Sequence, residues 1–181
     1  MKKAIIASAI TLAVFSGAAN AGAPNLNAGT FDLNFSGTVS ATTCALEPTV
    51  GGVNGKNDIA LGQTNKGVKG EDVDVIFKPT AAAAATCAGT TDFVMQWNGV
   101  GSSFESDGLK AATGTATDSH VQIKAVNALT ENNKVANVEG FQYTFAKDKV
   151  TGDGLQYKVA LMGGTEVGDM TATAQVKHWY K

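Results

Sequence analysis

Apolar and polar residues alternate with a period of two along most of the chain, a pattern typical of β-strands with one buried face. Segments rich in Gly, Asn, Asp, Ser and Thr separate the runs, for example 51–55, 98–101 and 151–154. Several short strands joined by Gly-rich turns favour an all-β sandwich or barrel. The runs are 31–35, 39–41, 59–61, 73–77, 93–97, 121–125, 141–145, 155–161 and 170–180.

The first residues have the layout of a secretory signal peptide. Lys2 and Lys3 precede the mainly apolar residues 4–15, and Ala19-Asn20-Ala21 supplies the small residues of a cleavage site. A membrane anchor is the alternative, but a spanning helix needs about 20 apolar residues. We therefore expect residues 1–21 to be removed and the exported chain to begin at Gly22.

The charge of the exported chain argues against nucleic acid as a partner. Without the two signal lysines, 12 basic side chains face 16 acidic ones, a net charge of −4, and the sequence contains no Arg. A surface without Arg lacks the bidentate donor that suits phosphates and base edges. The same charge disfavours an anionic membrane surface, and the remaining length corresponds to one domain.

Cys44 and Cys87 are the only cysteines. An isolated pair in an oxidising compartment usually forms one disulfide, although two free thiols or a metal pair are alternatives. Metal binding is disfavoured because no CxxC spacing exists and the only histidines, His120 and His178, lie far away in sequence. We expect a disulfide and no metal or other cofactor.

No set of residues predicts an enzyme. His120 follows Asp118-Ser119, but a catalytic triad is defined by geometry rather than by sequence neighbours, so His120 is interpreted as a polar residue starting a strand. Asp72 and Asp74 are expected on a solvated strand face. We interpret 152–154 as a hairpin turn, since it lacks the ligands of a calcium loop. By its phase, His178 lies on the apolar face of the last strand, where a structural role is favoured.

Several segments resemble the subunits of chaperone–usher pili. Residues 35–39 followed by Cys44 resemble their first strand, 59–63 their second-strand signature, 75–77 the segment before their second cysteine, and 121–123 their central strand. At the C-terminus, the penultimate Tyr180 and Gly168, fourteenth from the end, match the family's terminal β-zipper. Residues 92–99, with Trp97 before an Asn-Gly turn, resemble the major subunits of enterobacterial adhesive fimbriae in particular.

The resemblance implies an incomplete immunoglobulin-like β-sandwich, the pilin fold, whose groove accepts a donated strand, a form of β-strand addition. It assigns residues 22–36 to an N-terminal donor segment and 37–181 to the pilin domain. The acceptor groove and zipper would comprise Gly168, Met170, Ala172, Ala174, Val176, His178 and Tyr180. His178 departs from the family, which prefers an apolar residue there.

The donor residues would be Gly29, Phe31, Leu33 and Phe35. Burial of three such large side chains would contribute roughly 5–9 kcal/mol, at about 1.5–3 kcal/mol each. The alternative is an ordinary first strand of a complete sandwich. The family's usual glycine would fall at Phe31, whereas the glycine in phase here is Gly29, so the donor register stays open between these two positions.

The resemblance implies a structural, shaft-forming subunit that is exported through the periplasm to a surface fimbria and contributes to cell adhesion. Its partners would be a periplasmic chaperone, an outer-membrane usher and neighbouring subunits, and a host glycan is a further possibility. The alternative function is a soluble exported carbohydrate-binding β-sandwich that does not polymerise. A pilus subunit would have neither catalytic nor cofactor-binding residues.

Overall fold

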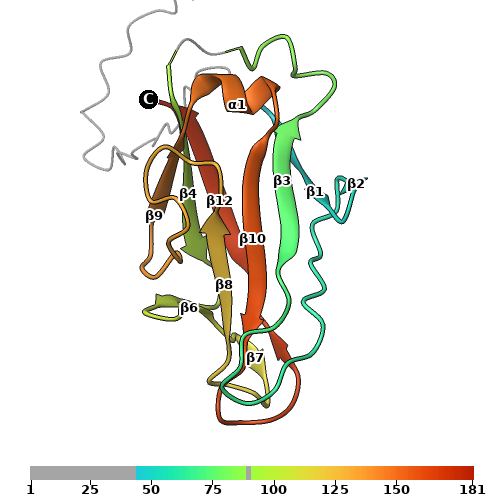
Figure 1. Cartoon of the computed structure of the whole chain (residues 1–181), viewed down its shortest axis with the longest axis vertical. Helices are drawn as coiled ribbons and strands as arrows, with labels where there is room; N and C mark the ends of the chain where they lie inside the picture. Colours follow the sequence, from blue (N-terminus) through green and yellow to red (C-terminus); the bar gives the residue numbers. More distant parts are fainter. Residues whose placement is uncertain (1–43, 89–90) are drawn as a thin grey trace, which may run out of the picture. The chain divides into compact units, whose positions relative to one another are not determined.

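The computed structural model describes residues 44–88 and 91–181. These residues all belong to one compact unit. The predicted signal peptide, the donor segment and the strands expected at 31–35 and 39–41 lie outside the described residues. Apart from one short helix, the regular secondary structure of the described part consists of β-strands (Figure 1), which confirms the predicted fold class.

Seven strands form the larger sheet, in the order β2-β1-β3-β10-β8-β6-β5, and all neighbouring pairs are antiparallel. Alternation of buried and polar residues explains the central strands. In β8, for example, Val121, Ile123 and Ala125 are buried between more exposed neighbours. The bounds are β1 Leu46–Val50, β2 Val53–Asn54, β3 Val73–Pro79, β5 Phe104–Glu105, β6 Gly108–Lys110, β8 His120–Ala125 and β10 Leu155–Met162.

A second sheet has three antiparallel strands in the order β12-β4-β9. These are β12 (Ala174–Tyr180), β4 (Phe93–Gly99) and β9 (Phe141–Phe145). Among the described residues, strands β7 (Thr113–Gly114) and β11 (Met170–Thr171) pair only with each other and form a separate two-stranded ribbon. The predicted strand 170–180 is therefore broken at Ala172 and Thr173, because its first two residues pair with β7 and its last seven with β4.

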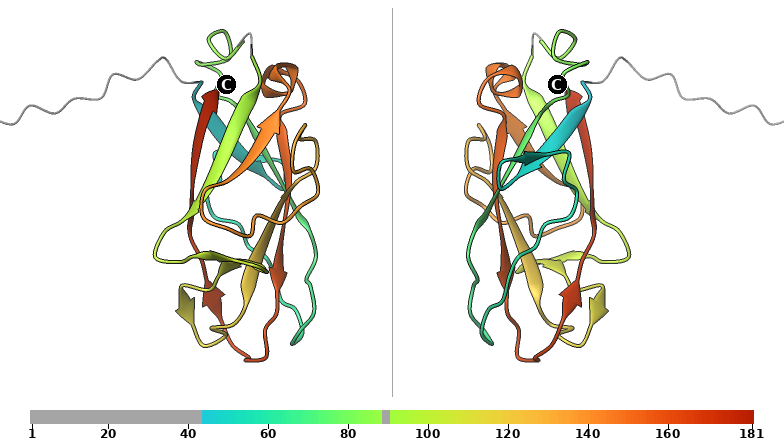
Figure 2. Two further views of the ribbon diagram at one scale, coloured as in Figure 1. Left: turned by 90° about the vertical axis from the view of Figure 1, so that its left-hand side faces the viewer. Right: turned by 90° about the vertical axis from the view of Figure 1, so that its right-hand side faces the viewer.

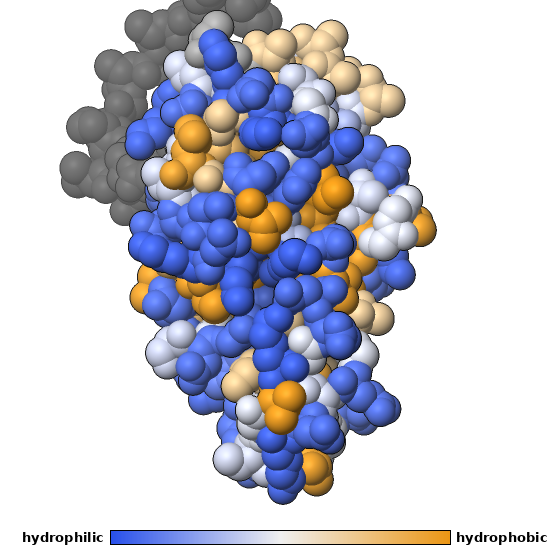
Figure 3. Space-filling model, viewed as in Figure 1, coloured by the Kyte–Doolittle hydropathy of each residue, from blue (hydrophilic) through white to orange (hydrophobic). Residues whose placement is uncertain are grey.

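Aromatic side chains from both sheets meet in one core. The Tyr157 ring of β10 lies 5.3 Å from that of Trp97 on β4 and 5.5 Å from that of Tyr143 on β9, between ring centroids. The Tyr143 hydroxyl lies within hydrogen-bond distance of the Ile123 and Lys134 carbonyl oxygens, at 2.9 and 2.8 Å. Burial raises the pKa of both tyrosines. The polar faces of the strands point outwards, and Figure 3 shows a mainly hydrophilic surface with separate apolar residues.

Two local predictions were wrong. Residues 152–154 do not form a hairpin turn, because they follow a short helix, α1 (Lys147–Thr151), that joins β9 of one sheet to β10 of the other. Residues 59–61 are irregular rather than a strand, and they line a groove instead of pairing. The alanine-rich segment 81–85 forms hydrogen-bonded turns, and the Cys87 N–H donates to the Ala83 carbonyl oxygen at 3.0 Å.

Candidate functional site

Strand β12 forms an open edge of the three-stranded sheet. It pairs with β4 on one side, and within residues 44–88 and 91–181 no strand pairs with its other side. Backbone bonds to the β4 side use the Thr173 carbonyl and the Lys181 N–H. Because these groups alternate along a strand, Ala174, Val176, His178 and Tyr180 direct their N–H and C=O groups to the open edge. Such an edge is a template for another strand.

A groove of about 1530 Å³ runs beside this edge. Its floor is the apolar interior between the two sheets, formed by residues such as Phe77, Trp97 and Ile123. One wall is β12 with the segment before it, and the other comprises β1 and residues 56–66. The groove therefore combines exposed core surface with unused backbone hydrogen-bonding groups, a combination that an extended apolar strand would satisfy.

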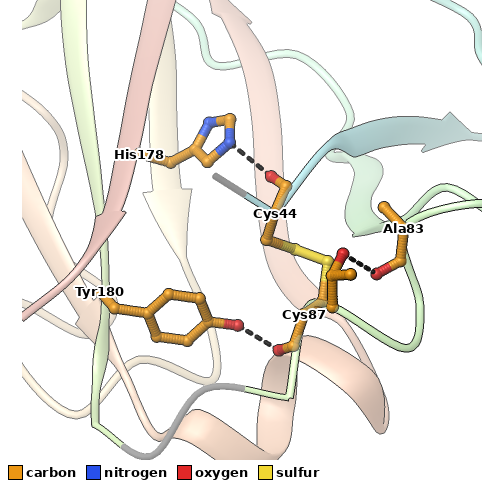
Figure 4. The surroundings of a disulfide bond; sticks show 6 residues. Cys44, Ala83, Cys87, His178 and Tyr180 are labelled. Carbon is orange, nitrogen blue, oxygen red and sulfur yellow. Dashed lines mark hydrogen bonds between the residues drawn. A yellow bond between two sulfur atoms is a disulfide. The ribbon is translucent and has the colours of Figure 1, made fainter. Parts of the chain in front are cut away.

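Hydrogen bonds near the disulfide link the two walls of the groove. Cys44 and Cys87 are joined as expected. The His178 Nε2–H donates to the Cys44 carbonyl oxygen at 2.7 Å, and the Tyr180 hydroxyl donates to the Cys87 carbonyl oxygen (Figure 4). In Figure 2, right, β1 begins beside β12 near the C-terminus and then diverges from it. The disulfide region thus fixes one end of the groove.

A carboxylate positions loops at the other end. The Asp118 side chain accepts hydrogen bonds from the Thr165 N–H and hydroxyl, both at 2.6 Å, and from the Glu166 N–H at 3.2 Å. These bonds hold the pKa of Asp118 at about 2, below its usual value of 3.8. A side chain at Gly164 would collide with this carboxylate. Because Ser119, Glu166 and Gly168 line the groove, Asp118 shapes its wall.

This arrangement predicts a loss of stability in acid. The depressed pKa means that ionised Asp118 stabilises the folded state fully above the ordinary carboxyl pKa, near pH 4, and that this contribution disappears as the pH falls through about 2. We expect Asp118→Ala to lower the unfolding midpoint at pH 6 and to change it much less at pH 2. Asp107→Ala, at an exposed carboxylate, is the control. An equal effect of Asp118→Ala at both pH values would contradict the assignment.

The structure brings together most of the residues predicted for the acceptor site. Six of them line the groove: Gly168, Met170, Ala172, Ala174, Val176 and His178. Tyr180 does not line it, because its ring packs on Phe93 at 4.9 Å and its hydroxyl bonds to Cys87. The predicted donor residues Gly29, Phe31, Leu33 and Phe35 lie outside the described residues.

Sequence reasoning missed two parts of the site. The wall formed by residues 56–66 has a weak signal, the apolar pair Ile59 and Leu61, which was interpreted as a strand. Asp118 was considered only as a partner of His120. Its position in a Thr-, Asp- and Ser-rich turn was the available signal, because aspartates there often accept backbone hydrogen bonds. His120 begins β8, as expected, and its Nε2 lies 3.5 Å from Glu105.

The described residues carry no arrangement suited to metal chemistry. None of the His, Cys, Asp and Glu side chains in 44–88 and 91–181 form a group of three or more that could hold a metal ion. In the same ranges, no helix is long and apolar enough to cross a membrane.

Comparisons with known proteins agree with this geometry. No family model matches the chain. It is 29% identical to the F107 fimbrial protein of Escherichia coli over 184 aligned residues, which cover all of both chains. It is also 29% identical to the K99 fimbrial protein of Escherichia coli over 116 residues, 64% of this chain and 63% of that protein.

The fold matches that of the P pilus rod subunit PapA. The TM-score is 0.50 at 16% sequence identity, and the match covers 84% of this chain and 100% of that chain. Fimbrial subunits associate with one another in an extracellular surface appendage and are not enzymes. Together, the full-length similarity to a fimbrial protein and the pilin fold support the assignment of this chain as a structural subunit of a fimbria.

Proposed function

We propose that the chain polymerises into a fimbrial shaft by donor-strand exchange, in which residues 22–36 of one copy fill the groove of the next. The observation that carries the proposal is the open edge of β12 above an apolar groove. Because each copy both receives and donates a strand, the contact is head-to-tail and produces an open polymer. A polymer of this kind on the cell surface contributes to adhesion.

The same groove needs an occupant before assembly. An apolar groove with free backbone groups at its edge is an aggregation hazard in a newly exported subunit. A periplasmic chaperone that lends a strand would cover it, and an outer-membrane usher would replace that strand with the donor segment of the next subunit. Cleavage before Gly22 is required for this route, because it frees the donor segment 22–36.

The sequence of the donor segment fits such a groove. Phe31, Leu33 and Phe35 share one face, and Asp32 and Asn34 lie on the other. We expect Leu33→Asp to abolish polymers, because an unpaired carboxylate in an apolar groove is strongly disfavoured. The matched control, Asp32→Asn on the outward face, should assemble as the wild type does. The measurement is the ladder of oligomers from cell-surface extracts on unheated detergent gels.

The outcomes separate the two functions under consideration. A ladder that disappears in Leu33→Asp and persists in Asp32→Asn supports polymerisation through this segment. A wild-type chain recovered from the cell surface or medium only as a soluble monomer contradicts it, and favours the soluble carbohydrate-binding sandwich. Chaperone binding should persist in Leu33→Asp, since the groove of that variant is unchanged.

A further inference from the structure

His178 narrows the groove at one position on β12. Its ring crosses from β12 to the Cys44 carbonyl, with 2.7 Å between Nε2 and the oxygen, and its centroid lies 5.6 Å from that of the Phe93 ring. The groove-lining residues that precede it in the same phase are smaller, namely Ala172, Ala174 and Val176. His178 is thus a large side chain held on two sides, at the end of a row of small ones.

The donor segment has the opposite order of sizes. In its apolar phase, Gly29 comes first and the large residues Phe31, Leu33 and Phe35 follow. Directly opposed residues of an antiparallel pair have side chains on the same face with Cβ atoms about 4.5–5.5 Å apart, so a large residue fits best opposite a small one. A glycine is the residue that leaves room opposite His178.

The direction of pairing follows from which residues line the groove. All neighbours in the β12 sheet are antiparallel. In a parallel arrangement with Gly29 beside His178, Phe31 would lie opposite Tyr180, whose ring packs on Phe93 and does not line the groove. An antiparallel segment instead runs from the disulfide end back along the small residues of β12.

We propose that the donor segment of a neighbouring copy pairs antiparallel with β12 in the register that sets Gly29 opposite His178. Phe31 then lies opposite Val176, Leu33 opposite Ala174 and Phe35 opposite Ala172. The proposal rests on the proposed function, and it names His178 as the residue that selects the register.

The neighbouring registers fit the groove less well. A shift of two residues in one direction sets Phe31 against the fixed His178 ring. A shift in the other direction sets the polar Asn27 there and moves Phe35 to Met170, where the backbone already pairs with β7. A shift of one residue turns the apolar face outwards.

Cysteine cross-linking measures the register directly. The outward residue Asp32 should lie opposite Gln175, a pair expected at a Cα–Cα distance of about 4.5 Å, within disulfide range. Thr173 and Lys177 would be its diagonal neighbours, at about 7–8 Å and too far for a bridge. Gln175 and Lys177 of β12 and Thr173, which directly precedes it, are all exposed, so they are matched sites. Asp32→Cys is combined with Gln175→Cys, Thr173→Cys or Lys177→Cys in the full chain.

The expected result is a heat-stable, reducible ladder from Asp32→Cys/Gln175→Cys and from neither other pair. Cross-linking through Lys177→Cys or Thr173→Cys, or a polymer that cross-links through none of the three, overturns the register. The unheated ladder of the wild type tests the proposed function separately. A wild type without polymers refutes both, whereas polymers linked at another position refute only the register.

Substitution tests the role of His178 itself. Gly29→Leu should abolish the unheated ladder, because its side chain meets the His178 ring, and Ala28→Leu, one residue away on the outward face, should leave the ladder intact. Adding His178→Ala to Gly29→Leu should restore polymers by opening space. Normal assembly of Gly29→Leu would overturn the proposal. So would a double variant Gly29→Leu/His178→Ala that forms no polymers although His178→Ala alone does.

Discussion

We expect a stable monomer when residues 22–36 are removed from the N-terminus and fused after Lys181. Its unfolding temperature should be far higher than that of a truncated chain that lacks residues 22–36 altogether. The fused segment would cover the groove floor and pair with the open edge of β12. Burial of Phe31, Leu33 and Phe35 contributes about 5–9 kcal/mol before backbone hydrogen bonds. For a domain of this size, that corresponds to more than about 10 °C in the unfolding midpoint, measured by calorimetry.

The control is the same fusion with Leu33→Asp in the fused segment, which should lose most of the added stability. Asp32→Asn in that segment should change little, because the residue faces outwards in this phase. Antiparallel pairing places the start of the segment next to Lys181, so a short flexible linker suffices. Equal midpoints for the fused and truncated chains would show that the segment does not complete the fold.

Replacing both Cys44 and Cys87 by Ala in the self-complemented fusion is expected to cost about 4 kcal/mol of unfolding free energy. The disulfide joins residues 43 positions apart, and closing a loop of that length in the unfolded chain accounts for a cost of this size. The same change removes the fixed point at which His178 and Tyr180 hold the groove walls together. Denaturant titration gives the free energy.

Comparison of Tyr180→Phe with the double alanine variant separates the covalent bond from the contacts around it. Tyr180→Phe removes one hydrogen bond and keeps the disulfide, so its cost should be about 1 kcal/mol. Non-reducing peptide mapping should recover Cys44 and Cys87 in one linked pair from the parent fusion. If the double alanine variant were as stable as the parent, the disulfide would not be a determinant of this fold.

Local pattern accounts for much of the fold. The alternation in β8, β9 and β10 predicted strands whose bounds differ by one residue or less from those in the structure. The all-β class followed from the same alternation and from the Gly-rich turns. The row of groove-lining residues before His178 was also evident, because Met170, Ala172, Ala174 and Val176 repeat with a period of two. These features depend on neighbours in sequence, so the sequence contains them directly.

Structural features that depend on contacts between distant residues were not evident from the sequence. Gly152 and Gly154 suit a hairpin, and only the assignment of β9 and β10 to different sheets makes α1 a crossover. Residues 59–61 have a strand-like pattern, but no strand within 44–88 and 91–181 pairs with them. The bonds from Thr165 and Glu166 to Asp118 join loops on either side of β8, β9 and β10. Periodicity carries no information on such pairs.

The pairing of β12 with β4 has a consequence for folding. Tyr180, the penultimate residue, pairs with Phe93, and β10 pairs with β3 across a similar span, with Val159 opposite Val73. Sheets built from such distant segments fold slowly, because long loops must close before their contacts stabilise them. The three-stranded sheet also lacks one of its edges until β12 has been synthesised. A chain that stops before Ala174 therefore has no β12 and lacks this wall of the groove.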